Sequence, residues 1–282
     1  MNFNTIKSHA KINLSLGVTG KLKSGYHKIE SIITFLDLVD EIKIKSIKNK
    51  NHKIYFSGKF SKGIKKNNTV SSLLKILDKK NLLNNRKFLI KINKNIPQKS
   101  GLGGGSMNAA TLIRYFKIKG ILNISKKNLL KLTKLIGSDV QFGLDNRTKA
   151  LYSNGDLVSF SKKIGFFFII IKPKFGCSTK EIYSGVKKYS PKRMKKNKKN
   201  YLSFANIFKL QNDLEKVVFK NYPQLKKIKL FMESLPNIRL VRMTGSGSSM
   251  LGYFLSKNKA INAAKLFRKK YKNYWCIVSK SI

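Results

Sequence analysis

Cysteine is scarce in this chain and long apolar runs are absent, and both shortages narrow what it can be. Its two cysteines, Cys177 and Cys276, form no CxxC pair, so we expect two buried thiols rather than a disulfide framework or a zinc site. The longest apolar run, FFFIII at 166–171, is far shorter than the ~18 residues that a membrane-spanning helix needs. The first residues also lack a secretory apolar segment. We therefore expect a soluble, cytoplasmic protein.

Acidic residues are scarce as well. Twelve Asp and Glu stand against sixty Lys and Arg, which gives a formal net charge of +48. Such a balance is typical of proteins that bind nucleic acid, and a basic nucleic-acid-binding protein is the alternative hypothesis. The lysines are spread along the whole chain, however, with one dense cluster at 187–201 that we expect to be a loop. The charge is therefore weak evidence for nucleic acid, although it would attract a polyphosphate substrate.

Apolar residues are plentiful, and their pattern predicts an α+β protein. Hydrophobic residues make up 41% of the 282 positions, enough for one large core or two medium ones. Apolar periodicity, turn residues and helix caps indicate strands and helices that alternate, and the pattern restarts near residue 150. The strands are expected at 10–18, 30–47, 53–58, 87–93, 165–173, 248–255 and 274–280, and the helices at 67–80, 125–137, 212–234 with a break at Pro223, and 257–271.

A glycine-rich loop follows the strand at 87–93 and leads into another helix. The segment GLGGGS at 101–106 has four glycines in five positions, whereas a tight turn alone would need one. Glycines before a helix start let backbone N–H groups and the helix dipole bind an anion, and Ser106 could cap the helix or bind a phosphate oxygen. The spacing fits neither a Walker A loop nor the dinucleotide fingerprint. The sequence therefore predicts a phosphate loop of another kind.

Other stretches place polar residues at regular positions around this loop. Lys11 and Asn13 lie on one face of the first strand, since side chains of a strand repeat every two residues. A turn at 21–32 presents Tyr26 and His27, and a second glycine-rich turn, MTGSGSS, enters the strand at 248–255. The order KIN, SGYH, GLGGGS, GSDV and MTGSG resembles the GHMP kinase superfamily. Within it, SGYHKIES and FLDLVD point to the branch that phosphorylates a cytidine-diphosphate ester of methylerythritol.

The resemblance implies a two-domain α+β GHMP kinase fold, with an N-terminal domain at 1–150, a C-terminal domain at 151–282 and the active site in the cleft between them. It implies ATP, as its Mg²⁺ complex, and a small-molecule substrate, with neither a membrane nor a specific nucleic acid as partner. We expect a monomer or weak homodimer. Lys11 and Asp139 would be catalytic, and Asn13, Tyr26, His27, Thr179 and Tyr183 would bind the cytidine substrate. The ATP-binding residues would be Asn68, Pro97, Gln98, Lys99, Ser100, Gly101, Leu102, Gly103, Gly104, Gly105 and Ser106, whereas metal ligands are not identified.

Each of these residues also has a simpler interpretation. Lys11 could be a surface lysine and Asp139 a helix cap, although a lysine in an apolar strand argues against the first. The tyrosines and His27 could be packing residues. The chain also departs from the family pattern, because Met107 stands where a second serine is usual and Gln98-Lys99-Ser100 replaces a smaller apolar and glycine run. We found no functional reason for Met107.

Overall fold

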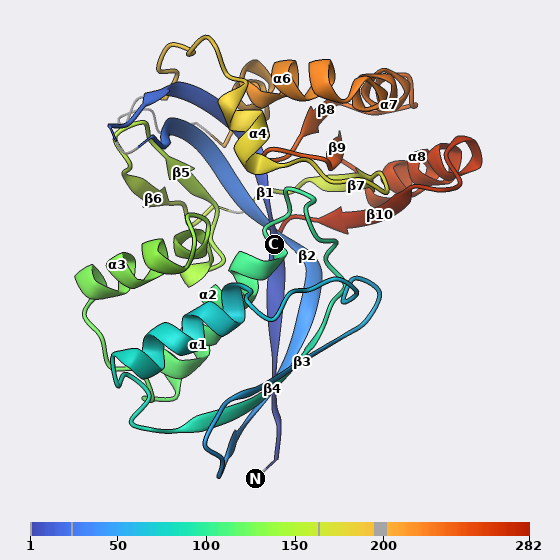
Figure 1. Ribbon diagram of the computed structural model, residues 1–282. Coiled ribbons are helices and arrows are strands. Elements are labelled where there is room, and N and C mark those ends of the chain that lie inside the picture. The colour runs from blue at the N-terminus through green and yellow to red at the C-terminus, as the bar shows by residue number, and fades with distance from the viewer. Residues whose placement is uncertain (1, 24, 163, 195–201) are drawn as a thin grey trace. The chain divides into compact units, whose positions relative to one another are not determined.

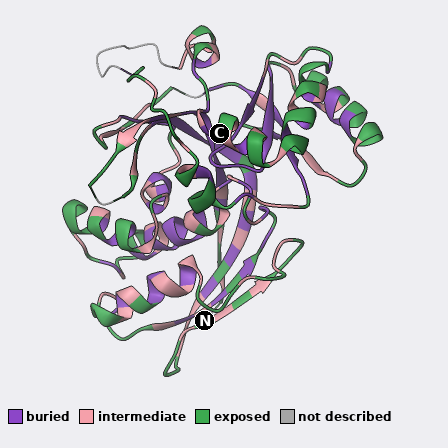
Figure 2. Cartoon of the chain, turned by 45° about the horizontal axis from the view of Figure 1, so that its top comes forward, coloured by how far each residue is buried: buried purple, intermediate pink, exposed green. Residues whose placement is uncertain are grey.

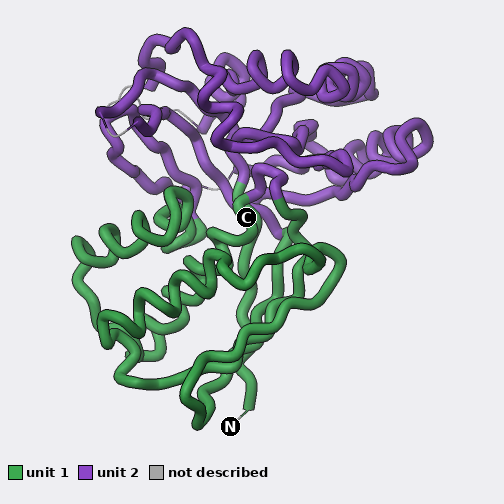
Figure 3. The backbone as a smooth tube through the Cα atoms, viewed as in Figure 1, with its two compact units in different colours: residues 1–11, 38–98, 103–146 green, residues 12–37, 99–102, 147–282 purple. Residues whose placement is uncertain are grey.

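A computed structural model describes residues 2–23, 25–162, 164–194 and 202–282. The cluster predicted to be a loop at 187–201 is therefore described only up to residue 194, where it forms neither helix nor strand. The chain folds into two compact units (Figure 3), which are discontinuous in sequence. Unit 1 contains Met1–Lys11, Leu38–Gln98 and Gly103–Asn146, and unit 2 contains Ile12–Asp37, Lys99–Leu102 and Arg147–Ile282. The family-based boundary near residue 150 stays a prediction.

Two long strands contribute to both units. They are β1 (Asn4–Lys21) and β2 (His27–Ile47), which pair with each other. In unit 1, β2 pairs antiparallel with β4 (Lys87–Asn93), and β3 (Lys53–Ser57) pairs parallel with β4. The alternation in KFLIKIN buries Phe88, Ile90 and Ile92, as expected for a strand with one face in a core.

Helices cover the core of unit 1 (Figure 1). They are α1 (Thr69–Lys79), α2 (Gly104–Ile118) and α3 (Lys126–Ile136), followed by the short 3-10 helix η1 (Val140–Leu144). The helices α1 and α2 lie side by side. Their apolar residues and those of the strands form one buried cluster, which includes Leu73, Leu77, Ile90, Ile113 and Phe116.

Unit 2 has a four-stranded antiparallel sheet at its centre. Its order is β10 (Trp275–Lys280), β7 (Phe167–Lys172), β9 (Met250–Phe254) and β8 (Leu240–Met243). The inner strand β7 contains residues 167–171 of the FFFIII run, and its residues from 168 to 172 are buried, as predicted for a strand covered on both faces. Buried stretches of the chain are purple in Figure 2. The short strands β5 (Lys149–Leu151) and β6 (Leu157–Ser159) extend the sheet of β2.

Helices complete the described part of unit 2. They are α4 (Thr179–Ser184), α5 (Phe204–Lys209), α6 (Leu214–Asn221), α7 (Pro223–Glu233) and α8 (Lys257–Lys270). The expected break at Pro223 is confirmed, because this proline is the first residue of α7, where its missing N–H costs nothing. The expectation of two buried thiols is half wrong: Cys177 is buried, but Cys276 lies on β10 and is only partly buried. In the described part of the chain, no helix is long and apolar enough to cross a bilayer.

Candidate functional site

The strand β1 brings Lys11 to the segment that precedes η1. Its Nζ lies 3.0 Å from the Oδ2 of Asp139. Lys11 is 4% exposed, so the surface-lysine alternative is wrong. Asp139 occupies the position before η1, but its side chain makes no capping hydrogen bond, which contradicts the capping alternative. The structure therefore joins the two residues that the family resemblance marks as catalytic.

The N-terminus of α2 lies beside this pair. The residue before the helix is Gly103, with a left-handed φ of 69° and no side-chain cap. Ser106 is thus the third residue of the helix, and the expectation that it caps α2 is wrong. A Cβ on Gly103 would stand 2.6 Å from the Cγ of Lys11, so only glycine allows this approach. The first N–H groups of a helix have no intrahelical acceptor, and here they can bind an anion next to Lys11.

A second lysine lies near the same helix turn. A Cβ on Gly104 would stand 3.3 Å from the Nζ of Lys94. Lys94 forms a buried ion pair with Asp40, whose Oδ1 also accepts from the backbone N–H groups of Asn95 and Ile96, at 2.8 Å and 2.9 Å. Burial lowers the pKa of Lys94, and Asp40 offsets this only in part. Sequence reasoning missed Lys94, although FLDLVD, which ends at Asp40, was among its motifs.

Three residues between Pro97 and Leu102 have structural features that help to hold the shape of the loop, and their predicted contact with ATP stays a prediction. The Nε2 of Gln98 donates to the carbonyls of Phe60 and Lys62, at 2.8 Å and 2.9 Å. Lys99 has a φ of 48°, a left-handed conformation that glycine adopts without strain. In unit 2, a Cβ on Gly101 would overlap the carbonyl oxygen of Thr244. The second glycine-rich turn therefore packs against Gly101.

Asn68 has a clear structural role. It is the N-cap of α1, where its Oδ1 accepts from the N–H groups of Val70 and Ser71, at 3.0 Å and 3.1 Å. Its Nδ2 donates to the carbonyl of Lys65. This cap accounts for Asn68 structurally, whereas its predicted contact with ATP stays a prediction.

Two of the predicted substrate residues are held by polar bonds in unit 2. Asn13 is buried; its backbone N–H donates to the Oγ1 of Thr244 at 2.9 Å, and its Nδ2 donates to the Oγ of Ser31 at 2.7 Å. The Oγ1 of Thr179, the first residue of α4, lies 3.0 Å from the Oγ of Ser246. Asn13, through its backbone N–H, and Thr179, through its side chain, thus bind the second glycine-rich turn, which the sequence placed among the family motifs.

The aromatic residues of the predicted cytidine site form a small cluster. The rings of His27, the first residue of β2, and Tyr183 of α4 lie 5.2 Å apart with an interplanar angle of 35°. Partial burial and the charge of Lys21 lower the pKa of His27, which favours the neutral imidazole. Tyr26 is 72% exposed in the turn before β2. The proposal that Tyr26 and Tyr183 enclose a base between them stays untested.

Met107 has a structural explanation that the sequence did not provide. It is 2% exposed, and a Cβ on Gly143 would stand 2.9 Å from its Sδ and 2.6 Å from the Cβ of Ala110. Met107 therefore fills the contact between α2 and η1, the helix that follows Asp139. The apolar side chain of Met107 thus packs against the helix that follows Asp139.

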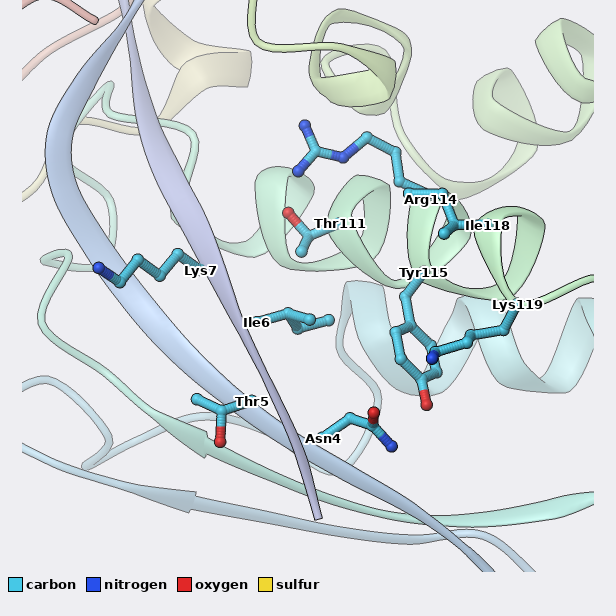
Figure 4. A pocket seen from close by; sticks show the side chains of 9 residues that line it. All are labelled: Asn4, Thr5, Ile6, Lys7, Thr111, Arg114, Tyr115, Ile118 and Lys119. Carbon is cyan, nitrogen blue, oxygen red and sulfur yellow. The ribbon is translucent and has the colours of Figure 1, made fainter.

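Unit 1 also has a pocket away from these residues (Figure 4). It lies between the start of β1 and the last turns of α2 and has a volume of about 320 Å³. Three of its lining residues, Lys7, Arg114 and Lys119, are cationic, and none of the predicted site residues lines it.

Comparisons with known proteins agree with this geometry. Residues 68–154 match the GHMP kinases N terminal domain, and residues 195–273 match the GHMP kinases C terminal domain. The chain is 51% identical to a 4-diphosphocytidyl-2-C-methyl-D-erythritol kinase of Pelagibacter ubique, over the whole length of both. It is 33% identical to the kinase of the same name of Clostridium botulinum strain Hall, over 94% of this chain and 96% of that protein.

The fold is also similar to solved structures. A crystal structure of a 4-(cytidine 5'-diphospho)-2C-methyl-D-erythritol kinase superimposes with a TM-score of 0.80 at 23% identity, covering 98% of this chain and 99% of that one. A homoserine kinase from Cytophaga hutchinsonii superimposes with a TM-score of 0.66 at 17% identity, covering 100% and 97%. At these identities the likeness concerns the fold.

Proposed function

Because the chain belongs to the GHMP kinase family, we propose that it transfers the γ-phosphoryl group of ATP to the 2-hydroxyl of 4-diphosphocytidyl-2-C-methyl-D-erythritol. The products are the 2-phosphate and ADP, in the non-mevalonate pathway to isoprenoid precursors. The full-length identity of 51% to a kinase of that name supports the substrate. The observation that carries the chemistry is the Lys11–Asp139 pair beside the open N-terminus of α2.

Phosphoryl transfer depends on positioning and on neutralising charge more than on covalent chemistry. The backbone N–H groups from Gly104 to Ser106 would hold phosphate oxygens, and the helix dipole would add partial positive charge. Lys11, whose Nζ lies 3.0 Å from Asp139, would orient that carboxylate and offset charge on the phosphoryl group. Asp139 would accept the proton of the attacking hydroxyl at a carboxylate oxygen.

The residues present suit Mg²⁺ that arrives on ATP. Mg²⁺ is commonly held by one or two protein oxygens together with substrate phosphates, and the described residues offer no group of three or more His, Cys, Asp or Glu that could hold a metal by themselves. The Oγ of Ser106 lies 4.0 Å from where a Cβ on Gly137, two residues before Asp139, would stand, so we propose Ser106 and Asp139 as the oxygen donors. Bound there, Mg²⁺ would neutralise phosphate charge.

The cytidine end of the substrate would be bound by residues of unit 2. His27, with a neutral imidazole, offers one donor and one acceptor nitrogen to the edge of the base. Tyr26 and Tyr183 offer aromatic faces on which a base can stack, and Asn13 and Thr179 offer polar groups. We further propose that the enzyme acts in the cytoplasm as a monomer or weak homodimer.

An assay of ADP formation tests the proposal. The protein is incubated with ATP, Mg²⁺ and each of three acceptors: the cytidine substrate, homoserine and mevalonate. We expect ADP to form with the cytidine substrate alone, and phosphorus NMR to show a new phosphate monoester. ADP formation with homoserine or mevalonate instead would assign the chain to another branch of the family. No acceptor-dependent ADP, together with salt-dependent RNA binding, would favour the nucleic-acid alternative.

A further inference from the structure

A third aromatic ring lies beside the predicted cytidine site. Tyr189, at the start of the basic cluster 187–201, has its ring 6.3 Å from that of His27, at an interplanar angle of 62°. The ring of Tyr183 contacts the same imidazole at 5.2 Å and 35°. His27 therefore has two aromatic neighbours, one tilted and one edge-on. Tyr189 is 47% exposed, so part of its ring is open to a ligand.

Backbone hydrogen bonds hold the segment that carries Tyr189. The N–H of Ser190, the next residue, donates to the carbonyl of Val18 at 2.8 Å. Further along, the N–H groups of Arg193 and Met194 both donate to the Oε2 of Glu30, at 2.9 Å and 3.2 Å. Glu30 is 3% exposed, and a carboxylate that accepts two N–H bonds is a strong anchor. The backbone on the C-terminal side of Tyr189 is thus bonded to β1 and β2, and β2 begins at His27.

We propose that Tyr189 is a positioning residue of the cytidine site, which fixes the plane of the His27 imidazole against the base. This inference rests on the proposed function. The χ2 torsion of histidine, which rotates the ring, has a broad distribution. An edge-on aromatic neighbour restricts this rotation. Cytosine and uracil differ in the hydrogen-bond donors and acceptors on their edges. The orientation of the His27 imidazole therefore determines the selectivity of the site for cytosine over uracil. The start of the basic cluster then has a role in substrate recognition.

Three variants separate an aromatic role from simple packing. Tyr189→Ala removes the ring, Tyr189→Leu keeps apolar volume without a ring, and Tyr189→Phe keeps the ring without the hydroxyl. Tyr55→Ala is the matched control, because Tyr55 is 56% exposed on β3 of unit 1. For each protein we would measure kcat, the KM of the cytidine substrate and of ATP, and the Kd of CDP and UDP by calorimetry.

We expect Tyr189→Ala and Tyr189→Leu to raise the KM of the cytidine substrate and the Kd of CDP by ~2–10-fold, the size of one aromatic pair interaction. The Kd of UDP should rise less, so the preference for CDP narrows. The KM of ATP should stay unchanged, Tyr189→Phe should behave as the wild type, and so should Tyr55→Ala.

The contrary outcomes are distinct. If Tyr189→Leu binds CDP as well as the wild type does, the ring acts only by packing and the inference is overturned. Unchanged CDP binding in Tyr189→Ala also overturns the inference about Tyr189. If the wild type still forms ADP in that case, the proposed function is unaffected. A wild type that neither binds CDP nor forms ADP overturns both together.

Discussion

The ammonium of Lys11 and the carboxylate of Asp139 lie 3.0 Å apart, and the two side chains differ in exposure, at 5% and 35%. The lysine is thus the desolvated partner, and the aspartate keeps a side open to a ligand. A buried ammonium that loses its partner is destabilising, so the pair is also part of the folding of unit 1. Substitutions here must separate catalysis from stability.

Asp139→Asn makes this separation best, because the amide oxygen of Asn can still accept a hydrogen bond from the Lys11 ammonium. Asn has nearly the same shape as Asp but cannot accept a proton at neutral pH, and a positioned general base typically contributes ~10²–10⁴-fold to the rate. We expect kcat to fall on about that scale, while calorimetry shows both substrates still binding. Near-normal turnover in a folded variant would show that the hydroxyl proton leaves by another route.

Lys11→Met tests the other member of the pair. It removes the charge but keeps most of the buried stem, which limits the loss of packing. We expect turnover to fall, and the double variant with Asp139→Asn to lose less than the two separate losses combined, because groups that act as one unit are not additive. Strictly additive losses would mean that the two residues act independently.

Gly103 is where the phosphate loop and Lys11 meet. Its φ of 69° is unfavourable for other residues, and a Cβ there would press on the Lys11 stem. We expect Gly103→Ala to weaken ATP binding and lower kcat together, because the added Cβ would disturb both the loop and Lys11, for which we propose a catalytic role. Gly120→Ala is the control: its φ is 64°, but a Cβ there would meet nothing within 4 Å. Equal ATP affinity in the two variants would contradict the role of the loop.

Much of this site could be predicted from local sequence, and the reasons are physical. Strand, glycines and helix follow each other in sequence, so the glycine loop at the start of α2 could be predicted from spacing alone. The partnership of Lys11 with Asp139 was not, since 128 positions separate them in sequence and only the family resemblance joined them. Lys94 escaped notice because it is one of many lysines, and its burial against Asp40 is a tertiary fact.

Met107 shows how a sequence departure can be structural. Because its thioether fills the space between α2 and Gly143, we expect Met107→Ser to lower the free energy of unfolding by about 2–5 kcal/mol, as for other buried truncations. Met107→Leu, which keeps the volume, should cost less than about 1.5 kcal/mol. Urea unfolding measures both. A serine variant as stable as the wild type would show that the chain closes the gap without Met107.

His52 of unit 1 has a fixed neutral tautomer. Its Nδ1 accepts from the backbone N–H of Phe88 at 3.1 Å, so the ring proton must sit on Nε2, which lies 3.2 Å from the Oδ1 of Asp78. Protonation of Nδ1 would break the bond to Phe88. Burial lowers the pKa of His52 below 6.5, and the hydrogen bond and charge of Asp78 offset this only in part.

The sign of the pH dependence follows from this lowered pKa. On acidification the unfolded chain takes up the His52 proton first, so the stability linked to this group is complete above pH 6.5 and is lost as the pH falls through the lower pKa of the folded state. We expect the free energy of unfolding to drop between pH 7.5 and pH 5 in the wild type. In His52→Gln the drop should be smaller, because the glutamine side chain at position 52 does not titrate in this range. Urea unfolding of both proteins at several pH values measures the difference.

Parallel pH profiles for the two proteins would mean that His52 is protonated as easily in the folded chain as in the unfolded one, and that the bond to Phe88 does not hold its tautomer.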